Sequence, residues 1–273
     1  MKTLVTATDF SKASLNAVNY AADMAAAINA RLEILHVIQV PVITDIPDYV
    51  VQLENEMYEQ GAHKLQLLKR KLEKRTANLV KIAYNIMEGD TNSAIKEEAK
   101  NKKPLAIILG SKGAGNLQNI IFGSVALHTA KHAQFPVLLI PEKAKFANVS
   151  AIAFATDLLA ENFSDLSKQL RKWLRLFDAR LDVVYVNNNP NFKIEKEKQF
   201  ASLKKHLSRY NVHFNYVENN SVPDGISAYI KTKKPGMMVL MYHKERFFHR
   251  LVYRSEFGNI FKNTTVPLLV IQG

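Results

Sequence analysis

The stretch PLAIILGSKGAGNLQNIIFGSVALHTAKHAQFPVLLIP, residues 104–141, decides the fold. It begins and ends with short apolar runs, residues 104–109 and 136–140, that lack any alternation of polar side chains. Such runs are typical of strands in a parallel sheet that helices cover on both faces. Between them, four of the chain's ten glycines fall within residues 110–124, and a stretch with helical character follows. The order strand, glycine loop, helix, strand predicts an α/β fold with a loop at the carboxyl end of a strand.

Four motifs of the first half recur in the second half in the same order. The pairs are LVTATDF and AIAFATD, ARLEILHVI and ARLDVVYVN, KKPLAIILG and KKPGMMVLM, and FPVLLI and VPLLVI. Within each half, short apolar runs alternate with longer amphipathic stretches, as in a doubly wound domain. The sequence therefore predicts two doubly wound parallel-sheet α/β domains in tandem, residues 1–143 and 147–273, joined within residues 142–150.

The first half is regular enough for its elements to be placed. Strands are predicted at residues 2–7, 31–38, 80–87, 104–109 and 136–140. Ser11 is a residue type that caps helices, and apolar residues follow it at helical spacing: Ala17, Ala21, Met24, Ala25 and Ile28. A similar stripe precedes the third strand: Met57, Leu65, Leu68 and Leu72. We interpret both stripes as core-facing rather than ligand-binding.

The composition narrows the classes of function. The chain has no cysteine, which excludes disulfides, thiolate metal sites and catalytic thiols and fits a cytoplasmic protein. No apolar run is long enough to cross a bilayer, so no membrane association is expected. The formal net charge is +12, and its larger share lies in residues 147–273, which hold 19 basic and 11 acidic side chains. A basic half can attract phosphate-bearing partners, but we interpret it as solvated lysine on helix faces and expect no nucleic-acid binding.

The glycine loop lies where ligands bind in this kind of sheet. Ligands bind beyond the carboxyl ends of the strands, at the point where the strand order reverses. Asp9 follows the first strand and Gly110 follows the fourth. Gly110 and Gly113 free the backbone to turn N–H groups towards an anion, and Ser124 can cap a helix whose positive N-terminal end favours phosphate. The residues alone leave two interpretations open: phosphate binding, or glycines that serve only turns and caps.

Two other glycine motifs do not match this loop. A P-loop requires Gly-Lys followed by Ser or Thr, and the chain has no such tripeptide. A dinucleotide fingerprint beginning at Gly113 would place Gln118 at its third glycine, and it would follow the fourth strand instead of the first.

The spacing of the loop resembles a known signature. Gly110, two residues, Gly113, nine residues, then Gly123 and Ser124 is similar to the G-2x-G-9x-G-[S/T] motif of nucleotide-binding universal stress proteins. The stretches TLVTATDFSKAS and RLEILHVI resemble that family's first strand with its acidic turn and its second strand. The resemblance covers the whole chain as two copies, and it implies the same fold that the apolar runs predict.

The resemblance implies a site for ATP, with Mg²⁺, in the first half. Ala7, Thr8 and Asp9 would flank the adenosine part of ATP, and the backbone of Val37 would contact the adenine. The loop residues would surround the ribose and the phosphates: Gly110, Ser111, Gly113, Gly123, Ser124 and Val125. Asp9 has an alternative role as a helix-capping residue beside Ser11.

The second copy departs from the motif. Alignment of MYHKERFFHRLVYRS with the glycine stretch places Met241, Lys244 and Arg254 where the motif glycines stand, and only Ser255 is retained. Side chains then fill the space in which phosphates would meet bare backbone, so ATP binding is not expected in this half. We interpret the basic and aromatic residues 243–254 as a surface helix; an acidic partner or a different anionic ligand is the alternative.

By this resemblance, the chain is expected to be an ATP-binding, cytoplasmic stress-response regulator that signals to a protein partner. No Ser-His-Asp set or carboxylate pair stands at a recognisable spacing, so at most slow ATP hydrolysis is expected. The alternative is an ATP-dependent adenylating or hydrolysing enzyme of the related α/β superfamily. Such adenylating enzymes carry a serine- and glycine-rich loop after the first strand, where this chain has TDFSKAS. A scaffold without a ligand is a third hypothesis, which the intact first motif disfavours.

The last strands of the two halves, VLLI and LLVI, predict an assembly. Members of the family commonly pair through this strand, and an uncovered strand edge is prone to pairing. The two halves are therefore expected to form an intramolecular pseudo-dimer, and a further homodimer stays open.

Overall fold

The computed structural model describes residues 1–40, 47–110, 123–157, 163–187, 193–242 and 264–272. The chain divides into two compact units, and the change from one to the other falls between Phe146 and Ala147. Each unit is an α/β domain with a parallel sheet, which confirms the predicted fold class. None of the described helices combines the length and the apolar composition that crossing a membrane requires.

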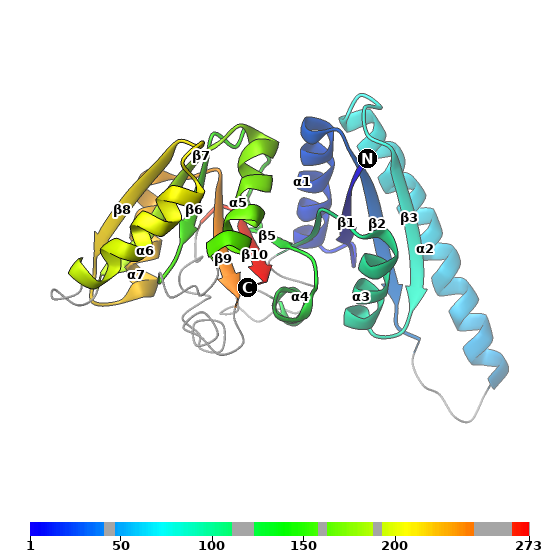
Figure 1. Ribbon diagram of the computed structural model, residues 1–273. Helices are drawn as coiled ribbons and strands as arrows, with labels where there is room; N and C mark the ends of the chain where they lie inside the picture. The colour runs from blue at the N-terminus through cyan, green and yellow to red at the C-terminus, as the bar shows by residue number, and fades with distance from the viewer. Residues whose placement is uncertain (41–46, 111–122, 158–162, 188–192, 243–263, 273) are drawn as a thin grey trace. The chain divides into compact units, whose positions relative to one another are not determined.

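The first unit alternates strands and helices (Figure 1). Its elements are β1 (Lys2–Ala7), α1 (Lys12–Ile28), β2 (Ala30–Ile38), α2 (Pro47–Arg75), β3 (Ile82–Glu88), α3 (Thr91–Lys102), β4 (Ala106–Gly110), α4 (Ser124–His132) and β5 (Val137–Ile140). The strands lie in the order β3-β2-β1-β4-β5, and each pairing is parallel. The strand order reverses between β1 and β4, and a crevice at the carboxyl ends of these two strands is the expected ligand position.

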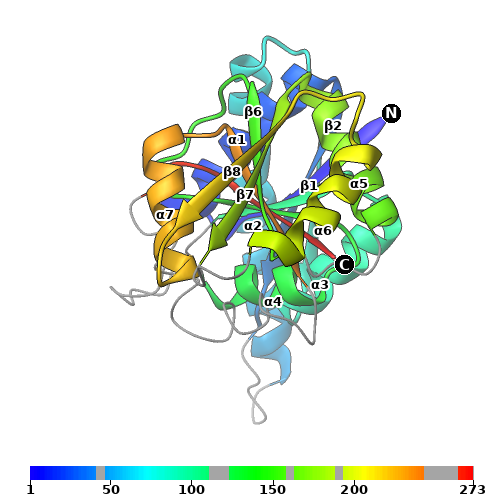
Figure 2. The same cartoon turned by 60° about the vertical axis from the view of Figure 1, so that its left-hand side comes forward.

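The strand order decides which helices share a face of the sheet. Right-handed crossovers carry α1 and α2 over one face as the chain moves outward to β3, and α3 and α4 over the other face as it moves to β5. The packing agrees, because α1 contacts α2 and α3 contacts α4. Both views of the ribbon show α3 beside α4 (Figures 1 and 2). Strand residues such as Leu4, Leu32 and Ile107 are buried between the two helix layers.

The predicted elements of the first unit agree with the observed ones to within two residues at the strand ends. The apolar stripe of α1 is buried throughout, as predicted: Ala17, Ala21, Met24, Ala25 and Ile28. In α2, Leu65, Leu68 and Leu72 are buried, whereas Met57 is only partly buried. Met57 is less buried because α2 is much longer than the strand on which it packs. The helix has 29 residues, whereas β3 has seven.

The segment after β5 remains part of the first unit. The side-chain amide of Asn16 in α1 donates to the carbonyl oxygens of Pro141 (3.1 Å) and Ala144 (3.0 Å). The ring of Phe146 meets that of Tyr20 edge to face at a centroid distance of 5.4 Å. These contacts hold the chain against α1 as far as Phe146.

The second unit repeats the arrangement in its own frame. Its elements are β6 (Ala151–Ala155), α5 (Phe163–Phe177), β7 (Arg180–Asn187), α6 (Lys193–His206), β8 (Val212–Glu218), α7 (Val222–Lys233), β9 (Met237–Tyr242) and β10 (Leu268–Gln272). The strands lie in the order β10-β9-β6-β7-β8, again all parallel. Counted within each unit, both sheets have the third, second, first, fourth and fifth strand in sequence, so the second unit also reverses between its first and fourth strands.

Candidate functional site

The turn after β1 is fixed by short-range hydrogen bonds. The Ser11 N–H donates to Asp9 Oδ1 (2.9 Å), and the Phe10 N–H donates to Thr8 Oγ1 (3.0 Å). Phe10 itself has a φ of 60°, a left-handed conformation that few residues other than glycine adopt. Thr8 Oγ1 also lies 3.0 Å from Ser14 Oγ in α1. The turn is therefore tied to the helix that follows, and it leaves Asp9 exposed at the carboxyl end of β1.

Ser11 caps α1, as the sequence predicts. Its side chain accepts a hydrogen bond from the Ser14 N–H (3.3 Å), which satisfies one of the free donors of the first helical turn. Asp9 does not occupy the N-cap position; its carboxylate instead accepts from the Ser11 N–H, inside the turn. Asp9 therefore does not cap the helix; its hydrogen bond stabilises the turn instead.

A group that sequence reasoning missed lies beside this turn. His36 Nδ1 is 2.8 Å from the Thr8 carbonyl oxygen, to which it donates in its Nδ1–H tautomer. The His36 and Phe10 rings lie tilted at a centroid distance of 4.7 Å, and Lys64 Nζ of α2 is 5.6 Å from the centre of the Phe10 ring. A Cβ on Gly61 would come within 3.0 Å of the His36 ring, so this glycine lets α2 approach. A glycine inside the amphipathic α2 is the sequence signal that points to this contact.

Gly110 at the end of β4 has a packing role that the motif does not reveal. A Cβ at this position would lie 2.7 Å from the Ala13 carbonyl oxygen and 2.9 Å from the Ala13 carbonyl carbon. Both atoms belong to the backbone of the first turn of α1, which has little freedom to move away. Bare backbone at Gly110 therefore lets α1 begin directly against the carboxyl end of β4.

The start of α4 differs from the sequence prediction. Gly123 occupies the N-cap position with extended backbone (φ −63°, ψ 160°), and Ser124 is the first helical residue. The prediction that Ser124 caps this helix is wrong, because the chain enters the helix one residue earlier than a serine cap requires. Gly123 has no side chain to accept a hydrogen bond, and no side-chain cap bond forms at this N-cap. The first N–H groups of α4 are thus left without the side-chain cap that Ser11 gives α1 and Asp90 gives α3.

Asp90 shows what such a cap does at the same edge of the sheet. It follows β3 and accepts from the Ser93 N–H (2.8 Å), and this hydrogen bond lowers the pKa of the Asp90 carboxyl. The carboxylate charge stays at the helix N-terminus, where the helix dipole favours it. At α4 a ligand anion can take the place that Asp90 takes at α3.

The strand register brings several predicted site residues to one edge. Ala7 at the end of β1 pairs with Leu35 of β2, two residues before Val37, and β4 pairs with β1 on its other side. Thr8 and Asp9 thus lie between the carboxyl ends of β2 and β4. Gly123, Ser124 and Val125 begin α4, which connects β4 to β5. Ser111 and Gly113 lie outside the described residues.

The second unit keeps the backbone of this edge. The Thr156 N–H donates to the Val184 carbonyl oxygen (3.1 Å), as the Thr8 N–H donates to that of Leu35 (2.9 Å). The two Thr-Asp pairs therefore occupy the same place in their sheets.

The side chains around that edge differ between the units. Met241 stands at the position of Gly110 and is 7% exposed, and Val186 stands at the position of Val37 and is also 7% exposed, whereas Val37 is only partly buried. A Cβ on Gly225 of α7 would come within 2.6 Å of Val186 Cγ1, so α7 covers this residue closely. Buried side chains thus stand where the first unit has a glycine and a partly buried valine. Lys244, Arg254 and Ser255 lie outside the described residues.

Metal ligands from the protein are not grouped at either edge within the described part of the chain. No three His, Asp or Glu side chains among those residues converge as they would around an ion. An Mg²⁺ ion brought by a nucleotide keeps phosphate and water ligands and needs only one or two carboxylates. Asp9 is the exposed carboxylate of the β1 turn.

The comparisons with known proteins agree with this fold. The model of the universal stress protein family matches residues 1–141. The chain is 32% identical over 146 residues to universal stress protein MJ0531 of Methanocaldococcus jannaschii, which covers 53% of this chain and 84% of the relative. The crystal structure of a universal stress protein from Archaeoglobus fulgidus has a TM-score of 0.72 at 18% identity, over 99% of this chain and 96% of that one, and shows the shared fold. A universal stress protein solved in complex with cAMP is 26% identical, over 52% of this chain and 98% of that chain, with a TM-score of 0.40.

Proposed function

This chain belongs to the universal stress protein family, and we propose that its first half, residues 1–143, binds ATP as the input of a cytoplasmic stress-response regulator. The observation that carries the proposal is the combination of two features of the first unit. Gly110 lets α1, which follows the Asp9 turn, start against the end of β4, and Gly123 is the N-cap of α4 without a side-chain cap bond. An anion is the natural ligand for such a helix N-terminus.

The residues of the first unit fit a nucleotide. Asp9 offers an exposed carboxylate to the hydroxyl groups of a ribose, and the backbone of Val37 is partly open to an adenine. Gly110, Ser111, Gly113, Gly123, Ser124 and Val125 are the residues that we assign to the ribose and the phosphates. When bound, ATP would supply the phosphate charge that α4 and the loop attract, and the chain's own groups would orient it. The Phe10 and His36 pair would stiffen the turn that carries Asp9.

The second half, residues 147–273, is proposed to bind no ATP. Met241 and Val186 are buried at the two positions that correspond to Gly110 and Val37. Opening a nucleotide site there would require buried apolar side chains to leave the core, which costs about 1.5–3 kcal/mol for each one exposed. We therefore propose one ATP per chain. The pseudo-dimer of the two halves remains a prediction of the sequence.

Isothermal titration of the full chain with ATP and Mg²⁺ tests this proposal. We expect one site per chain, and Gly123→Arg, which introduces the residue type found at Arg254, should abolish binding. Val266→Ala in the second half, at a residue 7% exposed, is the control and should leave the ATP affinity unchanged. Two equivalent sites, or undiminished binding by Gly123→Arg, would contradict the proposal. A parallel titration with cAMP shows whether the site requires the triphosphate.

The enzyme alternative is tested on the same sample. Incubation with Mg²⁺ and ATP should leave the nucleotide largely intact over many minutes, because we assign no general base to the site. Rapid release of ADP, or of AMP and pyrophosphate, would favour a hydrolysing or adenylating enzyme instead.

A further inference from the structure

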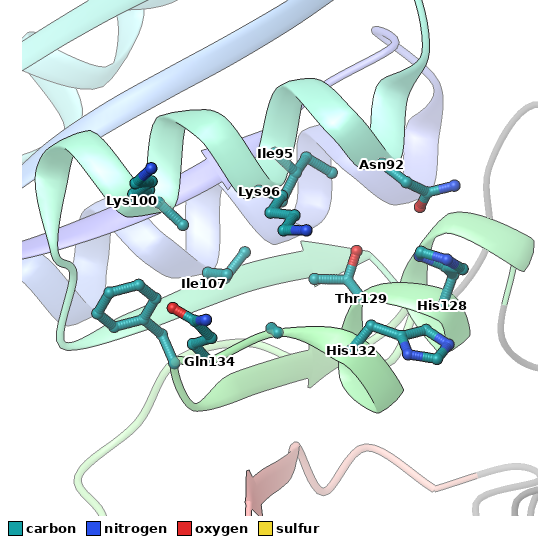
Figure 3. A pocket seen from close by; sticks show the side chains of 12 residues that line it. Asn92, Ile95, Lys96, Lys100, Ile107, His128, Thr129, His132 and Gln134 are labelled. Atoms are coloured by element: carbon teal, nitrogen blue, oxygen red, sulfur yellow. The ribbon is translucent and has the colours of Figure 1, made fainter.

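A cavity lies between α3 and α4, on the face of the first sheet opposite α1. Its volume is about 190 Å³, and its lining comes from α3, β4, α4 and the segment that follows α4 (Figure 3). Ile95, Ala99, Ile107 and Phe135 make most of the lining apolar. Cavities of about 150 Å³ with apolar walls accept a benzene ring. The space therefore suits a molecule with a body of one ring or a short alkyl chain.

Two polar atoms of the lining are buried without a hydrogen-bond partner. They are Thr129 Oγ1 of α4 and Asn92 Oδ1 of α3. Thr129 is 5% exposed, and Figure 3 shows its side chain turned towards the space between the two helices. Buried hydroxyl and amide groups are nearly always paired in native proteins, since leaving one unpaired is unfavourable. A ligand with one acceptor and one donor would satisfy both atoms.

The charged residues of the lining all have the same sign. Lys96 and Lys100 stand one helical turn apart on α3, and no Asp or Glu is among the described residues that line the cavity. Figure 3 shows the ammonium group of Lys96 reaching between the helices. On α4, His128 and His132 also stand one turn apart, with ring centroids separated by 4.5 Å. The Lys96 ammonium and two imidazoles around an apolar floor favour an anionic head group over a cationic one.

We propose that this cavity binds a small amphipathic carboxylate: a one-ring or six-to-eight-carbon body that carries a carboxylate and a separate hydroxyl group. The apolar body lies on Ile107 and Ala99, and the carboxylate accepts from Thr129 Oγ1 and the Lys96 ammonium. The ligand hydroxyl donates to Asn92 Oδ1. The site shares α4 with the proposed nucleotide site but none of its residues, so the two are tested separately.

The proposal is tested by the binding of 4-hydroxyphenylacetate to the full chain. Titration calorimetry and amide chemical shifts measure this binding. We expect a dissociation constant of about 1 mM or tighter, as is usual for a ligand of this size. The neutral 4-hydroxyphenethyl alcohol, which lacks the carboxylate, and phenylacetate, which lacks the hydroxyl, should each bind about tenfold more weakly. Absence of binding by 4-hydroxyphenylacetate, or equal binding of the neutral alcohol, would overturn the proposal.

Variants locate the site. Ala99→Leu fills the cavity and should abolish binding, while Lys96→Gln changes an exposed side chain that does not support the fold and should weaken binding about tenfold. Thr129→Val should weaken binding by a similar factor and leave the melting temperature unchanged or raised, because its hydroxyl has no partner to lose. A lower melting temperature for Thr129→Val would show that the hydroxyl is already paired, and unaltered binding by Lys96→Gln would place the ligand elsewhere. ATP titration of the same variants should match the wild type.

Discussion

The two halves of the chain share one sheet order and differ at the carboxyl edge of the sheet, where the proposed nucleotide would bind. In both units the threonine after the first strand donates its N–H to the second strand at the same place. The fourth strand then ends at Gly110 in the first unit, whereas the second unit has the buried Met241 at that position. The comparison teaches that the hydrogen-bonded framework of a doubly wound sheet does not depend on the site at its edge. A site can therefore be filled by side chains while the framework persists.

The halves also differ in how they bury charge. In the first unit Glu98 is 3% exposed and meets Asn85 Nδ2 (3.2 Å) and Lys102 Nζ (3.8 Å). In the second unit Asp182 is also 3% exposed, but it accepts from Tyr229 Oη (3.0 Å) and from Arg180 Nε (3.2 Å). Each buried carboxylate is paired, and the two units use different partners: an amide and a lysine for Glu98, a tyrosine and an arginine for Asp182.

The largest effect is expected from Gly110→Ala, which places a side-chain atom against the backbone of α1. The new Cβ would lie 2.7 Å from the Ala13 carbonyl oxygen, so α1 and the turn that carries Asp9 must shift. We expect the free energy of unfolding of the first unit to fall by about 3 kcal/mol and the ATP affinity to fall by at least about tenfold. Urea titration and calorimetry measure the two effects.

Met241→Ala is the matched change in the second unit. It removes a buried side chain, so it should cost about 2–3 kcal/mol of stability there through the cavity left behind, without changing ATP binding. A loss of ATP affinity in this variant would break the assignment of the nucleotide to the first unit.

A smaller effect is expected from Asp182→Asn. The change removes the carboxylate charge that accepts hydrogen bonds from Arg180 and Tyr229. The buried Tyr229 hydroxyl then has a weaker acceptor. Because the Arg180 side chain is 43% exposed, solvent weakens the ion pair, and we expect a loss of about 2 kcal/mol rather than the full cost of a buried pair. Glu98→Gln in the first unit should cost less, since its ion pair is longer (3.8 Å). Equal losses in the two variants, read from chemical denaturation, would contradict this ranking.

Tyr229→Phe should change how the stability of the second unit depends on pH. Burial, together with the Asp182 charge, raises the pKa of the Tyr229 phenol above its ordinary value of about 10. A raised pKa means that the folded state holds the proton more tightly, so this contribution to stability is complete below pH 10 and is lost as the pH rises further. At pH 7 the variant should be less stable by about 1 kcal/mol because the hydrogen bond to Asp182 is lost. Melting experiments should show the difference in stability between the wild type and the variant disappearing between pH 10 and 12.

Tyr20 is the counterpart of Tyr229 in the first unit. Burial alone raises the pKa of Tyr20, so Tyr20→Phe should also reduce the alkaline loss of stability. Among the described residues, the structure records no hydrogen bond from the Tyr20 hydroxyl to a carboxylate. Tyr20→Phe should therefore lower the stability at pH 7 by less than Tyr229→Phe does. A wild-type stability that stays constant from pH 9 to pH 12 would refute both expectations.

The smallest difference is expected between Ser11→Ala and Ser221→Ala. Each serine is an N-cap whose side chain accepts from the N–H of the third residue along, Ser14 or Asp224. Losing such a cap costs about 1 kcal/mol. Ser11 Oγ also reaches Ser14 Oγ (3.2 Å), so its replacement should cost slightly more and disturb the Asp9 turn. Urea midpoints of the two variants, measured under the same conditions, would show this difference in stability. A larger loss of stability for Ser221→Ala than for Ser11→Ala would contradict the prediction.

The sequence was most informative where the interaction is local or periodic. The apolar runs predicted the strands of the first unit because a strand buried on both faces needs apolar residues at every position. The burial of Ala17, Ala21 and Met24 followed from helical spacing, and the Ser11 cap followed from residue type. The repeat of four motifs predicted two domains, and the strands of the two compact units have the same order.

The cap of α4 shows how a local rule fails. Gly123 and Ser124 are adjacent and both are accepted at an N-cap, so residue type alone did not distinguish them. In the structure Gly123 takes the position, and this N-cap has no side-chain hydrogen bond.

The sequence by itself thus determined the fold class, the repeat and the edge at which Asp9 and Gly110 stand. Only the tertiary structure decided that Gly110 lies against the backbone of α1, that Phe10 and His36 pack together, and that a cavity with two unpaired polar atoms separates α3 from α4. The physical reason is the range of the interactions. Propensity, capping and periodicity act between near neighbours and can be read along the chain, whereas packing depends on which atoms of distant elements meet once the sheet has formed.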